Sequence, residues 1–145
     1  TEDIVSSNKY NNVFPIKTHK IPLLGDIACG EPIFASEDKE SYVLAGTDIR
    51  ADFCLRACGD SMINARIYDG DIVFIRKQSM VDNGEIAAVV IDDEATLKRV
   101  NYYPEKNLLI LKAENPDYED LVYTGEQLDH IIILGKAVAF QSDVR

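Results

Sequence analysis

Two segments of this sequence, around Ser61 and Lys98, contain residue types that covalent chemistry can use, and each is a weak signal when taken alone. Ser61 lies in a Gly-Asp-Ser-Met segment (59–62), a composition that also caps short helices, because Ser and Asp accept hydrogen bonds from unpaired N–H groups. Lys98 lies in a Thr-Leu-Lys-Arg segment (96–99), and a lysine near a strand end is most often a solvated charge. A serine hydroxyl becomes a good nucleophile when a base removes its proton. Lysine is such a base only when neutral, so burial must lower its pKa from about 10.4.

Other common chemistries find little support in the sequence. The motifs GxSxG, GxxxxGK[ST] and HExxH are missing, which removes most hydrolase and nucleotide-binding interpretations. His19 lies in a polar N-terminal stretch and His130 precedes an apolar run, so neither has the setting of a triad base. Cys29, Cys54 and Cys58 are odd in number and form no CxxC pair. This usage favours a reducing cytoplasm over a disulfide scaffold and predicts no metal site.

Length and composition describe one acidic domain. The chain has 145 residues, 46% of them hydrophobic, enough to bury roughly 68–70% of the unfolded surface. Twenty-five acidic against 15 basic residues give a net charge of −10, which argues against a free-standing DNA-binding domain. Residues 1–20 are polar with a charge of +1, so residues 21–145 carry −11. We expect a flexible linker or arm over 1–20 and a domain over 21–145.

The same sequence favours a cytoplasmic protein. No apolar run approaches the roughly 18 residues of a membrane span, and the N-terminal stretch contains no secretory signal pattern. Short apolar stretches separated by Gly, Asp and Asn predict a mainly β fold. Expected strands cover residues 21–24, 41–44, 53–58, 71–76, 85–91, 95–100, 108–111 and 131–140. Turns are expected at 69–71 and 82–84, a tight hairpin at Asp92-Asp93, and one short helix over 61–65.

Three segments, taken in order, resemble the self-cleaving serine peptidase domain of LexA and lambdoid phage repressors, a family that includes the UmuD mutagenesis proteins. They are Ile27-Ala28-Cys29-Gly30-Glu31-Pro32, Gly59-Asp60-Ser61-Met62 and Thr96-Leu97-Lys98-Arg99. Their flanks agree too, at residues 21–25, 51–53, 68–71 and 92–96. The resemblance covers residues 21–145. It implies a compact domain of the β-clip type, built of short, mostly antiparallel strands.

The resemblance assigns a role to each matched residue. The family's scissile bond falls on Cys29–Gly30, where Cys replaces the Ala usual in repressors, and Gly allows a tight turn beside the nucleophile. The nucleophile falls on Ser61 and the general base on Lys98. Backbone N–H groups of Asp60 and Ser61 are the candidate oxyanion donors. We expect other segments, including the cleavage loop, to bury Lys98. The resemblance implies neither a cofactor nor a metal nor a small-molecule substrate.

Two biological functions follow from the resemblance. The first is the regulatory domain of a transcriptional repressor that binds operator DNA through a domain absent from this chain. A RecA filament on single-stranded DNA would stimulate its cleavage in the SOS response to DNA damage. The alternative is a UmuD-like accessory subunit of a translesion polymerase, because the 28 residues before Cys29 suit a short arm. The segment 27–32 favours the repressor, and an upstream helix-turn-helix in the parent gene would decide.

Two other classes fit less well. Type I signal peptidases share the Ser-Met pair and a lysine base, but have a membrane anchor and a Pro soon after the Met, where Ile63 and Asn64 stand here. An inactive β module is disfavoured by the intact Ser61, Lys98 and Gly30.

The resemblance also implies a homodimer formed near the C-terminal strand. Residues 131–134 and 137–140 are apolar enough to pair across a twofold axis, although an internal core strand explains them equally well. The acidic residues after the seventh expected strand are expected to form a solvated face without a partner. They are Glu114, Asp117, Glu119 and Asp120.

Overall fold

The computed structural model describes residues 17–27 and 41–144. The strands are β1 (Thr18–Ile27), β2 (Tyr42–Gly46), β3 (Phe53–Ala57), β4 (Ile72–Lys77), β5 (Ile86–Ile91), β6 (Glu94–Tyr103), β7 (Leu108–Lys112), β8 (Leu121–Thr124) and β9 (Ile131–Gln141). Short 3-10 helices are η2 (Ile63–Ala65), η3 (Pro104–Lys106) and η4 (Gly125–His130). The predicted cleavage site, Cys29–Gly30, lies outside the described residues, as do residues 1–16.

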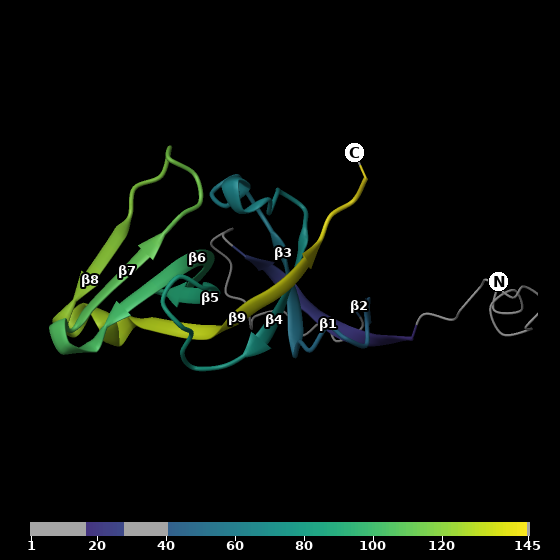
Figure 1. Ribbon diagram of the computed structural model, residues 1–145, viewed down its shortest axis with the longest axis horizontal. Helices are drawn as coiled ribbons and strands as arrows, with labels where there is room; N and C mark the ends of the chain where they lie inside the picture. Colours follow the sequence, from purple (N-terminus) through teal and green to yellow (C-terminus); the bar gives the residue numbers. More distant parts are fainter. Residues whose placement is uncertain (1–16, 28–40, 145) are drawn as a thin grey trace, which may run out of the picture.

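All strands of the described ranges belong to one sheet, in the order β2-β1-β3-β4-β9-β5-β6-β7-β8. Every pairing is antiparallel except the parallel one between β1 and β3. Strand β9 joins the two halves of the molecule, because its first half pairs with β5 and its second half with β4 (Figure 1). Gly135 lies where both pairings meet, and a Cβ there would lie 2.2 Å from the Arg76 carbonyl oxygen. The predicted mainly β, mostly antiparallel fold is confirmed.

Each of the eight predicted strands overlaps an observed one, but their lengths differ. β1 begins at Thr18, three residues before the expected domain start, and β6 extends to Tyr103. Strand β8 was not predicted. It has only four residues and follows a stretch rich in Pro and Asp, so its alternation of apolar and polar residues is too short to recognise. The predicted short helix near Ser61 is the 3-10 turn η2. Asp92 and Asp93 both have positive φ, 48° and 71°, as a two-residue type I′ hairpin requires.

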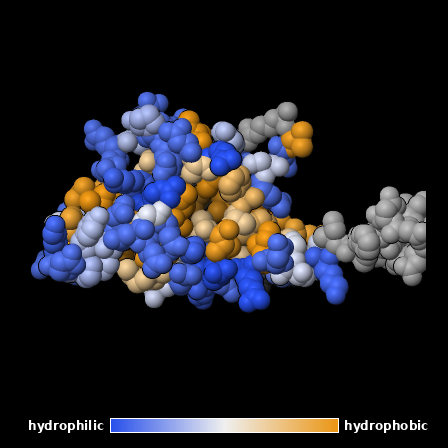
Figure 2. Space-filling model, in the orientation of Figure 1, coloured by the Kyte–Doolittle hydropathy of each residue, from blue (hydrophilic) through white to orange (hydrophobic). Residues whose placement is uncertain are grey.

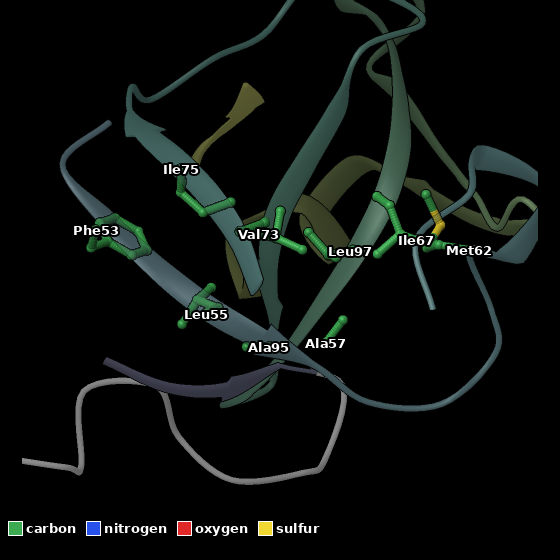
Figure 3. Close-up of a cluster of buried hydrophobic side chains, with 10 residues drawn as sticks. Phe53, Leu55, Ala57, Met62, Ile67, Val73, Ile75, Ala95 and Leu97 are labelled. Carbon is green, nitrogen blue, oxygen red and sulfur yellow. The ribbon is translucent and has the colours of Figure 1, made fainter. Parts of the chain in front are cut away.

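The largest core cluster joins segments that are far apart in the sequence. Met62, Ile67 and Leu97 lie in it with side chains from β3 and β4, and Met62 and Leu97 are each 3% exposed (Figure 3). Met62 follows Ser61 and Leu97 precedes Lys98. Burial of the two apolar neighbours therefore fixes the backbone on both sides of the predicted site.

Two further clusters complete the core. One, under β5, β6 and β7, contains Val89, Val100 and Leu111; the other, under β1 to β4, contains Ile21 and Phe74. Strand β6 contributes to a cluster on each face, because Leu97 and Val100 point to opposite sides. On the outside, Figure 2 shows hydrophobic side chains near the middle of one face, surrounded by hydrophilic ones.

Candidate active site

Ser61 lies on the loop that connects β3 to β4, and the base of this loop is closed by hydrogen bonds. The Gly70 N–H donates to the Ala57 carbonyl at 2.8 Å, and the Gly59 N–H donates to Asp69 Oδ1 at 2.8 Å. Gly59 has φ +85°, a conformation that glycine adopts without strain. Asp71, 1% exposed, accepts the Tyr68 N–H at 2.8 Å. These contacts hold the loop as a fixed turn rather than an open connection.

Lys98 lies in the middle of β6, paired with Ala87 of β5. Its side chain is only 8% exposed. Burial disfavours the ammonium form and lowers the pKa of Lys98 below its ordinary value of 10.5. Within the described residues no carboxylate forms an ion pair with it. A buried lysine without an anionic partner is neutral at a lower pH than an ordinary lysine, which is what a base requires.

Ser61 and Lys98 line the same cleft, whose volume is about 520 Å³. Its walls come from the Ser61 loop, from the end of β5 with the turn to β6, from β6 itself, and from the segment that leads into β8. The lining residues are Cys58, Gly59, Asp60, Ser61, Ile91, Asp92, Glu94, Ala95, Thr96, Lys98, Tyr118, Leu121 and Tyr123. This volume is within the roughly 300–1,000 Å³ typical of protein ligand sites, and the walls combine apolar side chains with the polar groups of Ser61 and Lys98.

Among the described residues, two backbone N–H groups of the Ser61 turn have no hydrogen-bond acceptor. The Gly59 N–H is already engaged by Asp69. By contrast, neither the Asp60 nor the Ser61 N–H donates to any other residue in the described part of the chain. Backbone N–H groups are the usual donors to a developing oxyanion, and this role of Asp60 and Ser61 stays a prediction.

The segment 114–118, which follows β7, packs against the Ser61 loop, and its role was not foreseen from the sequence. The Glu114 carbonyl accepts the Asn64 N–H at 2.8 Å, and the Glu114 carboxylate pairs with Arg99. Glu114 is thus only partly exposed (27%), whereas the other three acidic residues of the predicted solvated face are exposed. The reason is that Arg99, next to Lys98, points toward this segment and supplies the opposite charge.

Asn115 is the second residue of this segment that sequence reasoning missed. It is 5% exposed, and its Nδ2 donates to the Asp60 carbonyl at 2.9 Å. The only local signal was the Asn-Pro dipeptide at 115–116, which indicates a turn. Its partner lies 55 positions away in the sequence, so no local pattern connects the two.

The fold and the cleft together define a class: a mainly β domain that brings a serine turn and a buried lysine to one cleft. The Peptidase S24-like family model matches residues 22–138. The chain belongs to this family, which confirms the resemblance on which the residue assignments rest. No helix of the described ranges is long and apolar enough to cross a membrane.

The chain is similar to several LexA repressors. It is 40% identical over 125 residues to the LexA repressor of Desulfitobacterium hafniense (strain DSM 10664 / DCB-2), covering 84% of this chain and 58% of that protein. Against that of Leptospira interrogans (serogroup Icterohaemorrhagiae, serovar copenhageni) the identity is 42% over 111 residues, 74% of this chain and 54% of that protein. Against that of Staphylococcus aureus (strain Newman) it is 36% over 148 residues, with coverages of 98% and 68%. The chain thus spans somewhat more than half of the first two relatives.

Proposed function

We propose that this chain is the C-terminal regulatory domain of a LexA-type transcriptional repressor, and that it cleaves itself between Cys29 and Gly30. The observation that carries the proposal is the single cleft lined by Ser61 and the buried Lys98. Membership of the Peptidase S24-like family and the similarity to LexA repressors support it. Operator DNA is bound by a domain outside this chain, linked through residues 1–20 to the domain over 21–145.

The reaction is acyl transfer followed by hydrolysis. Neutral Lys98 takes the proton of the Ser61 hydroxyl, whose Oγ adds to the Cys29 carbonyl carbon. The N–H groups of Asp60 and Ser61 stabilise the oxyanion that forms. The Cys29–Gly30 bond then breaks, and Lys98 passes its proton to the new Gly30 amine. Water hydrolyses the Ser61 ester in the second half of the reaction and frees the Cys29 carboxylate.

Cleavage of this kind needs a restraint, because the substrate belongs to the same chain and its effective concentration is high. We assign the restraint to the conformation of the cleavage loop: the fraction of molecules with the loop docked in the cleft sets the rate. A RecA filament on single-stranded DNA raises that fraction in the SOS response, which places the protein in the cytoplasm with the chromosome.

We also propose that the chain forms a homodimer in which β9 lies near the twofold axis. Along this strand Phe140 is 41% and Ile132 59% exposed, although β4 and β5 already pair with it. Ala137 to Phe140 also line an apolar groove of about 340 Å³. A second copy would cover apolar surface that otherwise faces water.

Alkaline incubation of the purified chain tests the proposed reaction. At pH ~10, near the ordinary lysine pKa, Lys98 is largely neutral, and intact-mass measurement should show two products, residues 1–29 and 30–145. Ser61→Ala serves as the control, since it removes only the hydroxyl; it should remain intact with an unchanged circular dichroism spectrum. An intact wild-type chain after long incubation, or cleavage that persists in Ser61→Ala, would contradict the proposal.

A further inference from the structure

The backbone carbonyl of Asp60, which directly precedes Ser61, accepts a hydrogen bond from a side chain in the connection between β7 and β8. Asn115 Nδ2 donates to it at 2.9 Å, and Asn115 Oδ1 accepts the Asp117 N–H at 2.9 Å. Because one end of the amide faces a carbonyl and the other an N–H, its orientation is defined. The side chain is 5% exposed, so water does not compete strongly for either bond.

This contact acts on Ser61 through the peptide bond. The Asp60 carbonyl and the Ser61 N–H belong to one planar trans unit, in which they point in opposite directions. A donor that fixes the carbonyl therefore fixes the direction of the N–H. A hydrogen bond to the carbonyl also polarises the peptide and strengthens the N–H as a donor.

We propose that Asn115 is a positioning residue that orients the Ser61 N–H toward the oxyanion of the cleavage reaction. The proposal rests on the self-cleavage proposed above and adds a residue to it. Asn115 does not touch the reacting atoms; it acts through the Asp60–Ser61 peptide. The Asp60 carbonyl also accepts the Ile63 N–H, but at 3.4 Å, a longer and weaker contact.

Two other residues of the segment 114–118 form hydrogen bonds to the Ser61 loop, at positions other than the Asp60 carbonyl. The Asn64 N–H donates to the Glu114 carbonyl at 2.8 Å, and the Tyr118 hydroxyl donates to Asp60 Oδ1 at 2.5 Å. The Tyr118 bond holds the exposed Asp60 side chain, whereas the Asn115 bond holds its backbone. Only the second has a direct path to the Ser61 N–H, which makes the two contacts separable by mutation.

Asn115→Asp and Asn83→Asp form a matched pair for this test. The Asn83 amide likewise donates to a backbone carbonyl and accepts a backbone N–H, but it does not line the cleft. Asn115→Asp keeps the size of the side chain and the acceptor for Asp117 but removes the donor to the Asp60 carbonyl. We expect its self-cleavage rate to fall about tenfold or more at every pH, since loss of one oxyanion donor typically costs 10²–10³-fold. In Asn115→Ala, which adds no charge beside the cleft, the pH midpoint of the rate should stay at the wild-type value, because the charges around Lys98 are unchanged. Asn83→Asp should stay within about twofold of wild type, because Asn83 lies outside the cleft.

Three results would overturn the proposal. One is a wild-type rate in Asn115→Asp. Another is a midpoint in Asn115→Ala that moves toward the ordinary lysine pKa, which would mean that the cleft has opened and that Asn115 is only structural. The third is an equal loss in Asn83→Asp. If Asn115→Asp does not fold, Asn115→Ala replaces it, because it removes the donor without burying a charge. A wild-type chain that never cleaves would instead refute the proposed function itself.

Discussion

The two sides of the cleft are built in different ways. Lys98 is held by a β ladder: β6 lies between β5 and β7, and the residue pairs directly with Ala87. Ser61 is held by no ladder; it sits on a connection between β3 and β4 that is secured by side chains and by the segment 114–118. The proposed base thus has the rigidity of the sheet, whereas the proposed nucleophile depends on individual hydrogen bonds.

The low pKa of the lysine and the free backbone N–H groups come from different sides of the cleft. Burial within the sheet, with apolar residues on both faces of β6, lowers the pKa of Lys98. The loop supplies what a strand cannot, namely backbone N–H groups that no ladder consumes. A strand amide is paired with its neighbour, so an oxyanion site is more readily formed on a turn. A substitution on the sheet side and one on the loop side should therefore differ in how much each changes the cleavage rate relative to the stability of the fold.

Removing the base gives the largest expected effect. Lys98→Met keeps the approximate length of the side chain but cannot accept a proton, so self-cleavage at alkaline pH should fall at least about 10³-fold, as for other members of catalytic constellations. Intact-mass measurement follows the reaction. Lys112→Met is the matched control, because Lys112 is 49% exposed at the end of β7, and it should cleave at the wild-type rate.

The same Lys98→Met variant should also be more stable than wild type at neutral pH. The lowered pKa of Lys98 means that folding penalises its charged form, and the penalty is full below the folded-state pKa. Between that pKa and 10.5 the unfolded chain binds more protons, so wild-type stability rises with pH and the difference between the proteins shrinks. Ser61→Ala can be placed in both chains to prevent cleavage. Thermal unfolding that shows no difference at pH 7 would contradict the buried-lysine account.

A smaller loss of cleavage is expected from a substitution at the contact between the Lys98 strand and the Ser61 loop. Glu114 pairs with Arg99 of β6, and its backbone holds the Ser61 loop at Asn64. Glu114→Gln weakens the ion pair while keeping the backbone contact, so cleavage should fall about two- to fivefold. Stability should change by no more than about 1 kcal/mol, since both side chains are partly exposed.

Asp120→Asn is the control for this substitution. Asp120 pairs with Lys112 at 4.0 Å, with both side chains about half exposed, and neither lies at the Ser61 loop. Its cleavage rate should match that of wild type. Equal losses in Glu114→Gln and Asp120→Asn would show that charge alone, rather than the connection between the two sides, controls the rate.

The sheet side of the site was predictable from the sequence to a greater extent than the loop side. Alternating apolar residues predicted β5 and β6, and two aspartates predicted the hairpin between them. The role of Lys98 was inferred from the resemblance to the peptidase family. The only local indication that Lys98 is buried is the apolar character of the residues around it in β6. The β3–β4 turn was expected from Asp69-Gly70-Asp71. The contacts of Asn115 and Glu114 join residues separated by many positions, so only the fold brings them together. The cleavage-site prediction at Cys29–Gly30 lies outside the described residues.

The most direct test of the central claim compares two pH titrations. One measures the rate of self-cleavage of the wild-type chain against pH. The other follows the Lys98 side chain by NMR in the intact Ser61→Ala protein. If neutral Lys98 is the base for Ser61, the rate rises with the deprotonation of Lys98, and both midpoints coincide below 10.5, the ordinary lysine value. A Lys98 that titrates at its ordinary pKa, or a rate that does not follow its titration, would contradict the account.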